Sequence, residues 1–270
     1  TPMNGTPMRI MHTLFSRGFA GTERATAEMC NACVAEHDVT LVLQRQHRAS
    51  NGVSIRDHLD ERVRVVEVSR WFPAWGLARA IRDHRPEITH THLRKSTRLV
   101  ARLKPTCATI ATLHMWVNGP QFLEMDGLIV IAQWQKRDLA RYRGRIFDIN
   151  ESLIPTPRVA AEQRRHLREL AGAGETEFLI GGVGRLAKSK GFDTLIRAFE
   201  QAAIPDAKLA IIGDGRERKR LEKLAQSDRV RFLGFRPDAK AFYQAFDLFV
   251  SPSRSEPLGR VLFEAIDAGT

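Results

Sequence analysis

The sequence predicts an α/β fold made of two doubly wound, Rossmann-like domains. Short β-branched or apolar runs alternate with segments of helical spacing, which is typical of β-α-β units around parallel sheets. This rhythm stops at Ile154-Pro155-Thr156-Pro157, because each proline disfavours helix at the residue before it, and it resumes at Phe178. The length of 270 residues suits two domains, since domains cluster near ~100–150 residues.

The first half carries the longer series of alternating elements. We expect strands at residues 9–14, 39–43, 63–68, 88–91, 109–113, 128–131 and 152–154. We expect helices at residues 23–36, 75–84, 96–103 and 134–142. The helix at 23–36 would place Ala25, Met29 and Cys33 on one face, as an amphipathic helix packed on a sheet requires.

The second half repeats the pattern on a smaller scale. We expect strands at residues 178–183, 209–212, 230–233 and 248–250, and helices at 192–201, 216–225, 239–245 and from 258 onward. Four strands make a small doubly wound sheet, and the sequence stops at Thr270 without a closing element. We therefore expect the C-terminal domain to be truncated, and the chain to be less stable and less active than a longer version.

These patterns divide the chain into four segments. Residues 1–7 are expected to be a disordered N-terminal extension, and residues 8–155 an N-terminal domain. Residues 156–174, which are polar and Arg-rich and end in Ala-Gly-Ala-Gly, are expected to be a linker. Residues 175–270 are expected to form the incomplete C-terminal domain.

The composition is that of a globular chain with an anionic ligand or partner. The chain has 42 Lys and Arg against 31 Asp and Glu, a net charge of +11, and it is 43% hydrophobic. The excess charge favours nucleic acid, phospholipid headgroups or phosphorylated small molecules, and does not choose among them. Three cysteines and the absence of a long apolar run predict a cytoplasmic protein, with peripheral membrane contact left open.

The strongest chemical pattern lies at residues 251–265. A small-residue loop follows a strand, and a helix is expected to open near Leu258, so the amides of Leu258 and Gly259 would face an anion at the carboxyl edge of the sheet. Glu256 and Glu264 would bracket a ligand and suit its hydroxyl groups. The alternative is a carboxylate that favours the helix dipole together with an ordinary surface glutamate.

A second pattern lies at residues 181–191, where a strand ends in glycines. It delivers Arg185 and Lys190 to the same carboxyl edge, and these two cations could neutralise a diphosphate. The spacing fits neither a Walker A loop nor G-x-G-x-x-G. A common glycine-rich turn is the alternative.

The first half offers a loop and histidines at its own strand ends. Gly21 lies in a loop after the first strand, and Thr22 could cap the following helix. His90, His92 and His114 end two strands, where open α/β sheets bind ligands. The pair Cys30 and Cys33 lies inside an expected helix and is expected to pack in the core rather than hold metal; no Asp-x-Asp is present, so no metal site is expected.

These patterns together resemble the retaining glycosyltransferases of family 4, which have the two-Rossmann-domain GT-B fold. The resemblance runs from Met8 to the end of the chain and is most specific at the Glu-x7-Glu motif, Glu256 to Glu264. Further matching segments are Gly21-Thr22-Glu23-Arg24, Thr91-His92, Leu113-His114, Gly184-Arg185-Leu186, Lys190-Gly191, Ile212-Gly213-Asp214-Gly215 and 230–234. The segment 154–157 departs from the Pro-Asn-Gly that the family often has.

The resemblance implies a role for each matching position. Arg185 and Lys190 would bind the donor diphosphate in place of a metal, with the amides of Leu258 and Gly259. The other implied contacts are Glu264 with the ribose, Glu256 with the donor sugar, Phe235 with the base, His114 with the donor sugar and acceptor, and Gly21 with the transferred group.

The implied reaction is transfer of a sugar from a nucleotide diphosphate sugar, with retention of anomeric configuration, to a glycan or lipid-linked acceptor. Cell-surface polysaccharide or lipopolysaccharide synthesis is the expected setting, with no cofactor and no nucleic-acid partner. The alternatives are a sugar-nucleotide epimerase of the same fold, and a basic protein that binds nucleic acid or a membrane surface.

Overall fold

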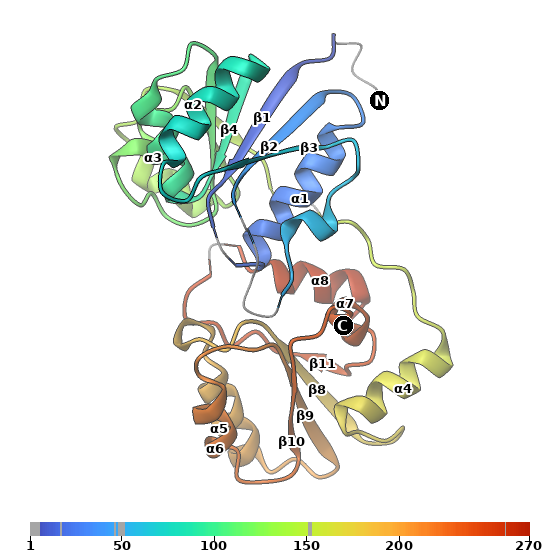
Figure 1. Cartoon of the computed structure of the whole chain (residues 1–270). Helices are drawn as coiled ribbons and strands as arrows, with labels where there is room; N and C mark the ends of the chain where they lie inside the picture. The colour runs from blue at the N-terminus through green and yellow to red at the C-terminus, as the bar shows by residue number, and fades with distance from the viewer. Residues whose placement is uncertain (1–5, 17, 46, 48–51, 151–152, 257) are drawn as a thin grey trace. The chain divides into compact units, whose positions relative to one another are not determined.

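The computed structural model describes the chain except for residues 1–5, 17, 46, 48–51, 151–152 and 257 (Figure 1). Its internal contacts divide the chain into two units, Thr1–Glu151 and Ser152–Thr270, and each is described by itself. The expected extension at residues 1–7 lies mostly outside the described residues. The limits of the predicted domains stay predictions.

The first unit is built on a parallel sheet with the order β3-β2-β1-β4-β5-β6-β7. Its strands are β1 (Arg9–Leu14), β2 (Asp38–Gln44), β3 (Arg64–Val68), β4 (Ile88–His92), β5 (Ala108–Leu113), β6 (Gly127–Val130) and β7 (Arg145–Asp148). The chain proceeds outward from β1 in one direction to β3, and then from β4 in the other. The point between β1 and β4 is the topological switch point, where sheets of this kind bind ligands.

Helices cover this sheet on both faces. They are α1 (Gly21–Cys33), α2 (Pro73–His84) and α3 (Leu93–Leu103), with short 3-10 helices η1 (Ile55–His58), η2 (Pro120–Phe122) and η3 (Gln133–Leu139). Side chains alternate between the two faces: Leu41 and Leu43 of β2 pack in the core that includes Ala27 of α1. Val42 packs in the other core, with Leu77 of α2. Both faces of β2 are therefore buried, which explains its continuous apolar run.

The second unit repeats the design with a sheet of order β10-β9-β8-β11, in which all pairs are parallel. Its strands are β8 (Phe178–Val183), β9 (Ala207–Ile212), β10 (Val230–Gly234) and β11 (Leu248–Phe249). Its helices are α4 (Ala161–Ala171), η4 (Lys188–Lys190), α5 (Phe192–Ala202), α6 (Arg218–Leu224), α7 (Ala239–Tyr243) and α8 (Arg260–Ala268). The switch point of this sheet lies between β8 and β11.

The predicted α/β fold with two doubly wound sheets is confirmed, two of the expected elements are wrong, and one helix was not expected. No strand forms at the described residues 153–154, because the seventh strand lies earlier, at β7. Helix α4 lies inside the expected linker, where its Leu167 and Ala171 pack in the core of the second unit. The segment expected as a helix at 134–142 is instead the 3-10 helix η3.

None of the helices that the structure describes is long and apolar enough to cross a bilayer.

Candidate functional site

The loops at the carboxyl edge of the second sheet are joined through their backbones. Gly184 N donates to Ile212 O (2.9 Å), and Gly213 N donates to Gly234 O (2.7 Å). A Cβ on Gly213, where φ is +138°, would lie 1.9 Å from Gly184 O. Only glycine permits this approach, so the loops after β8, β9 and β10 form one connected surface at the edge where ligands bind.

Lys190 and Glu256, which the sequence predicts to bind the donor, form an ion pair at the switch point. Lys190 ends η4 in the loop after β8, and its Nζ contacts Glu256 Oε1 in the loop after β11. Ser253 Oγ donates a hydrogen bond to the same oxygen (2.9 Å). The Lys190 and Glu256 side chains are 23 and 21% exposed, so both remain reachable from solvent.

Arg254, which sequence reasoning missed, fastens the loop after β11 to the loop after β8. Its Nη1 donates to Lys188 O (2.7 Å), and its guanidinium pairs with both carboxylate oxygens of Asp193 in α5 (2.9 and 3.0 Å). Its backbone N also donates to Ser189 O (2.8 Å). Hydrogen bonds from Arg254 hold the pKa of Asp193 below its usual value. Arg254 thereby sets the position of Glu256, two residues later.

Helix α8 begins at Arg260, two residues later than predicted, so Leu258 lies before the helix and its amide is not one of the helical donors. Gly259 is the N-cap, in the left-handed region at φ +75°. A Cβ there would meet Leu262 Cδ1 at 3.1 Å. The left-handed conformation of Gly259 moves the start of α8 to Arg260. The pattern of residue types alone does not predict this start, because it does not give the backbone conformation of Gly259.

Glu264 faces inward from α8 rather than lying open at the surface. Its side chain is 8% exposed, and Tyr243 Oη donates to its Oε2 (3.0 Å). Arg260 Nε lies 3.9 Å from its Oε1, one helical turn away. The alternative of an ordinary surface glutamate is therefore wrong, because this carboxylate is buried and held from two sides.

Arg185 and Phe235 follow strands β8 and β10, which lie on either side of β9. Arg185 is exposed and makes no ion pair with any residue that the structure describes. Phe235 is 36% exposed. An exposed cation and an exposed ring at one sheet edge could meet the phosphate and the base of a nucleotide.

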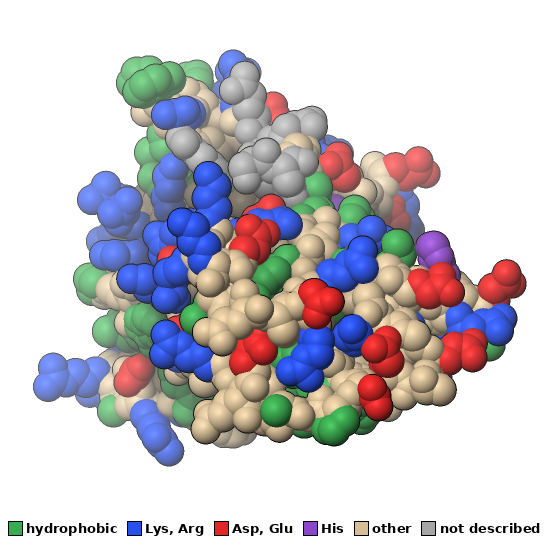
Figure 2. All heavy atoms as spheres, turned by 90° about the horizontal axis from the view of Figure 1, so that it is seen from below, with side chains coloured by type: hydrophobic (Ala, Val, Ile, Leu, Met, Phe, Trp, Pro, Cys, Tyr) green, Lys and Arg blue, Asp and Glu red, His purple; other side chains and the backbone are tan. Residues whose placement is uncertain are grey.

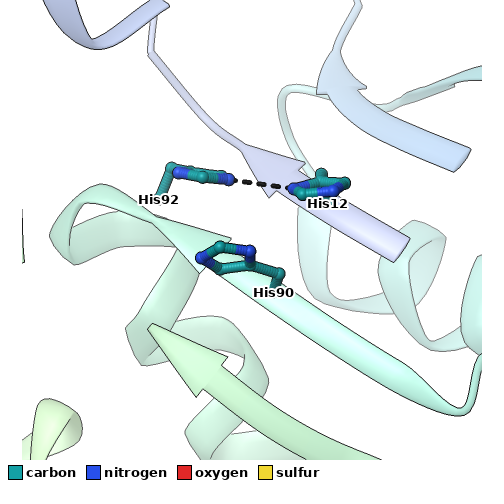
Figure 3. Close-up of side chains that lie close together, drawn as sticks. All are labelled: His12, His90 and His92. Carbon is teal, nitrogen blue, oxygen red and sulfur yellow. Dashed lines mark hydrogen bonds between the residues drawn. The ribbon is translucent and has the colours of Figure 1, made fainter. Parts of the chain in front are cut away.

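In the first unit, four buried histidines line the switch point between β1 and β4. His12 Nδ1 lies 3.1 Å from His92 Nε2 (Figure 3). His92 Nδ1 lies 3.1 Å from His114 Nε2. His90 Nε2 instead lies 2.7 Å from Thr112 Oγ1, and its ring packs 4.4 Å from that of His92. Sequence reasoning missed His12. Its signal is the parallel register of β1 and β4, which places His12 opposite His90.

Burial keeps His12, His90 and His92 neutral. It lowers the pKa of His12 to about 4, and it lowers the pKa values of His90 and His92 well below the usual 6.5. Nearby rings add to the shift for His90 and His92, because a second positive charge so close would be repelled.

The facing nitrogens of His12, His90 and His92 lie within 4.8 Å of one another, which is a spacing that a metal ion could draw together. Tetrahedral zinc bound at ~2.0–2.1 Å would require about 3.3 Å between the ligand nitrogens. His12 and His92 already share one hydrogen bond, and His90 is engaged with Thr112. A hydrogen-bonded chain from His12 through His92 to His114 describes the geometry better.

Gly21 is the first residue of α1, the helix that follows β1 in the chain. A Cβ there would meet nothing within 4 Å. The N-cap is Ala20, whose N donates to Glu23 Oε2 (3.0 Å), so Thr22 lies inside the helix and the expected Thr22 cap is wrong. Cys30, which lies within α1, packs in the core, as expected.

On the face that Figure 2 shows, basic side chains are most numerous toward the left of the view, and acidic side chains lie among basic ones over the rest. Many arginines are paired: Arg62 with Asp60, Arg218 with Glu222, and Arg236 with Asp238. A continuous basic stripe would be expected of a nucleic-acid surface, and the mixed pattern does not favour one.

Comparison with known proteins shows similarity in sequence and in fold. The family model described as "Glycosyl transferases group 1" matches residues 163–270. The lipopolysaccharide core biosynthesis glycosyltransferase LpsD of Rhizobium meliloti (strain 1021) is 30% identical over 279 aligned residues, covering 97% of this chain and 76% of LpsD. LpsE of the same strain is 42% identical over 119 residues, covering 43% of this chain and 33% of LpsE.

Among solved structures, Anabaena Alr3699/HepE in complex with UDP and glucose superposes with a TM-score of 0.82. The identity is 20%, and the match covers 97% of this chain and 79% of HepE, which shows the shared fold. Neither an epimerase nor a nucleic-acid-binding protein is favoured by these relatives.

Proposed function

Because this chain belongs to the group 1 glycosyl transferases, we propose that it moves a sugar from a nucleotide diphosphate sugar to a lipid-linked glycan acceptor. The family is shown by the LpsD similarity along the chain and by the family model at residues 163–270. A family 4 enzyme that retains the anomeric configuration is the finer proposal, and it rests on the Glu256 to Glu264 spacing described above.

The observation that carries the donor site is the pairing of Lys190 with Glu256 at the switch point of the second sheet. We assign Lys190 and Arg185 to the diphosphate, together with the backbone at Leu258 and Gly259. Glu256 is placed beside the phosphate-binding cation and is assigned to the sugar hydroxyls.

The nucleoside would lie beside the buried carboxylate of α8. Glu264 is assigned to the ribose hydroxyls, and its bond from Tyr243 Oη fixes one of its oxygens. Phe235, exposed at the end of β10, is assigned to the base. Solved structures of HepE are named as complexes with UDP and with UDP-glucose, which makes UDP-sugars the first donors to test.

On the first unit, we assign His114 and Gly21 to the transferred sugar and the acceptor. His114 lies at the end of the histidine chain, and Gly21 leaves open space at the start of α1. In the reaction, the bond from the anomeric carbon to the diphosphate oxygen breaks, and its electron pair stays with the nucleoside diphosphate. A bond to an acceptor hydroxyl oxygen forms, and that hydroxyl releases its proton.

We propose that this reaction needs no metal. Arg185, Lys190 and the backbone amides near Gly259 would stabilise the charge that develops on the leaving diphosphate, which is the kind of preorganised electrostatics that dominates many enzymes. LpsD and LpsE, as their names state, act in lipopolysaccharide core biosynthesis. We therefore propose a lipopolysaccharide-type acceptor at the cytoplasmic face of an anionic membrane.

The experiment is a thermal-shift screen with UDP-, GDP-, ADP- and CMP-sugars in EDTA, because a specific ligand stabilises the folded state by mass action. One nucleotide class should raise the melting temperature, and product NMR with that donor should show the anomeric configuration unchanged. Stabilisation that requires a divalent metal, or an inverted product, would contradict the respective part of the proposal.

A further inference from the structure

Three large aromatic side chains of the first unit are exposed to solvent. Trp71, Phe72 and Trp75 are 80, 71 and 68% exposed, within five residues of chain. Neighbouring exposed aromatic rings on a folded protein indicate an interaction surface, because a partner that removes this apolar area from water is bound favourably. We call these three side chains the aromatic patch.

The backbone holds the aromatic patch outward. Ser69 Oγ accepts hydrogen bonds from the N–H groups of Trp71 (3.2 Å) and Phe72 (3.4 Å), which fixes the turn after β3. Helix α2 then begins at Pro73 and turns Leu77 and Ala80 into the core. Trp75 therefore lies on the outer side of α2, where it cannot reach that core.

The space beneath the helix is closed as well. A Cβ on Gly76 would lie 2.7 Å from Val68 Cβ, so α2 packs directly on the end of β3. The aromatic patch thus has no room to fold inward, and its exposure is built into the local packing.

Arginines surround the aromatic patch. The guanidinium of Arg70 lies 5.4 Å from the centre of the Trp71 ring, and that of Arg79 lies 6.0 Å from the Trp75 ring. Arg82, one turn further along α2, shares the single carboxylate of Asp83 with Arg79 (3.5 and 3.3 Å). Three cations and one anion leave this surface positively charged.

We propose that the aromatic patch and its arginines dock this protein on an anionic phospholipid bilayer. Trp and Phe side chains suit the boundary between headgroups and acyl chains, and arginines suit the phosphates above it. The patch follows β3 at the carboxyl edge of the sheet, which is the edge that carries Gly21 and His114. The inference deepens the proposed function, since it assigns the membrane contact to particular residues.

The test is co-sedimentation with phosphatidylcholine vesicles, with and without phosphatidylglycerol. The full chain should bind the anionic vesicles, with a blue shift of tryptophan fluorescence, and should bind neutral vesicles weakly. The triple variant Trp71→Ser, Phe72→Ser, Trp75→Ser should lose about tenfold or more in binding, and so should Arg70→Gln, Arg79→Gln, Arg82→Gln, since each cation at the surface contributes about fivefold.

Matched controls remove the same chemistry elsewhere. Arg141→Gln, Arg143→Gln, Arg145→Gln removes three exposed charges from the same unit, and Phe178→Ser removes an exposed ring from the second unit. Both should bind vesicles as the unchanged chain does. Equal binding by the patch variants, or self-association in place of vesicle binding, would overturn the proposal. UDP titration of the same variants reads the donor site separately.

An independent inference concerns the histidine chain. A neutral imidazole has one N–H and one bare nitrogen, so the two hydrogen bonds of His92, to His12 and to His114, must run in the same direction. Either His12 Nδ1 donates toward His92 and His92 Nδ1 donates toward His114, or both bonds run the other way.

The buried Nε2 atom of His12, at one end of the histidine chain, decides between these two directions. His12 Nε2 is buried and has no hydrogen-bond partner among the residues that the structure describes. Buried N–H groups without an acceptor are rarer than acceptors without a donor. His12 Nε2 is therefore the bare nitrogen, and His12 Nδ1 carries the proton that it donates to His92 Nε2.

We infer that His12 and His92 are positioning residues that fix His114 with its proton on Nδ1. His92 Nδ1 then donates to His114 Nε2, so the Nε2 lone pair of His114 is occupied and its proton lies on Nδ1. The tautomer itself is a property of the folded chain alone.

The tautomer can be measured by long-range 1H–15N correlation on the full chain labelled with 15N-histidine, at about pH 7.5. We expect protonated Nδ1 and bare Nε2 in His12, His92 and His114, whereas free neutral histidine in water favours the proton on Nε2. A proton on Nε2 of His114 would overturn the inference. One equivalent of zinc that shifts the ring nitrogens of His12, His90 and His92 together would overturn it too.

Variants distinguish an effect of the hydrogen-bonded histidine chain from an effect of ring packing. His12→Asn keeps an amide donor near the position of Nδ1, so the tautomer of His114 should persist. His12→Leu removes that donor, and the Nε2–H form of His114 should become populated. His90→Leu makes the same change in a ring that stacks on His92 outside the chain, and it should leave His114 unchanged.

Discussion

Lys190 and Glu256 neutralise each other at the edge of the second sheet, so on the proposed function the donor diphosphate would compete with a carboxylate for this cation. Arg185, in the same loop after β8, is exposed and makes no ion pair among the described residues. It would supply a second positive charge to an anion, and Glu256 would then be available to hydroxyl groups.

Replacing Lys190 tests this arrangement. Lys190→Ala should lower kcat/KM for sugar transfer about 100-fold or more, in line with the loss of one preorganised electrostatic contact. Lys188→Ala, in the same 3-10 helix but exposed, is the matched control and should have little effect. Adding Glu256→Gln to Lys190→Ala removes the unpaired carboxylate and should not restore transfer. Transfer by Lys190→Ala at the rate of the unchanged chain would contradict the diphosphate role.

The neutral histidines make stability depend on pH. The pKa of His12 is about 4 in the folded chain and 6.5 when unfolded, so the unfolded chain binds more protons between these values. The free energy of unfolding should be fully maintained above about pH 6.5 and fall as the pH drops, by on the order of 3 kcal/mol for His12 near pH 4. Urea unfolding at about pH 7.5 and about pH 5 measures this.

Two variants test whether His12 contributes to this pH dependence of the free energy of unfolding. His12→Asn removes one of the three shifted groups and should reduce the pH dependence, of which His90 and His92 keep a part. His166→Gln, on an exposed side chain of α4, should leave the pH dependence as it is. A pH dependence that His12→Asn leaves unchanged would show that His12 does not contribute in this way.

At the scale of elements, the glycines in the loops have two different reasons to be glycine. Gly213 is required by the backbone, because a Cβ would collide with Gly184 O. Gly21 is not, because the protein leaves the space above it open. An unfilled space beside a strand end is consistent with a ligand that occupies it.

The substitutions Gly21→Ala and Gly213→Ala should therefore behave in opposite ways. Gly213→Ala should destabilise the second unit by about 3 kcal/mol or more, since backbone loops must move apart. Gly21→Ala should change the free energy of unfolding by less than about 0.5 kcal/mol and yet lower the rate of transfer. Unfolding and transfer assays on both proteins give the comparison, and full activity in Gly21→Ala would remove Gly21 from the site.

Arg254 links two loops, so its removal should affect binding more than folding. Arg254→Ala breaks the bonds to Lys188 O and Asp193 that hold the segment before Glu256. We expect KM for the donor to rise about tenfold, because a loosely held loop must be ordered when the ligand binds. Arg254→Lys keeps the charge but not the two-pronged geometry, and it should recover little. An unchanged KM in both variants would contradict the role of Arg254.

The elements that the sequence predicted best are those with a buried periodic pattern, such as β2 and β8. Helix α4 was missed because its exposed face is rich in Arg and Glu and only Leu167, Arg168 and Ala171 turn inward. Strand β7 was missed because every residue of it is exposed at the edge of the sheet, so no burial pattern marks it. From the sequence, Arg254 is an ordinary cation in a loop. Its pairing with Asp193 depends on how the loops fold, and the sequence pattern does not predict it.

At the scale of the molecule, the two units use the same design. In each, a parallel sheet reverses its strand order at a switch point, and candidate site residues lie in or after the strands on either side of it. The sequence predicted this architecture and most of the site, since strand ends can be located from periodicity. It could not predict the histidine chain, because its hydrogen bonds depend on the register of β1 and β4 and on ring orientation.

The net positive charge of the molecule does not come from one basic surface. The net charge of +11 is spread over a surface where many arginines are paired, so it does not by itself define a ligand. The cations that matter in this account are few: Arg185 and Lys190 for the donor, and the arginines beside the aromatic patch for the bilayer.

The most direct test of the donor site is isothermal titration of UDP and UDP-glucose into the full chain in EDTA. We predict saturable binding with one site, retained without metal and weakened about tenfold or more in Lys190→Ala and in Glu264→Ala. Binding that appears only when a divalent metal is added, or that is equally strong in both variants, would contradict a metal-independent donor site at the switch point of the second sheet.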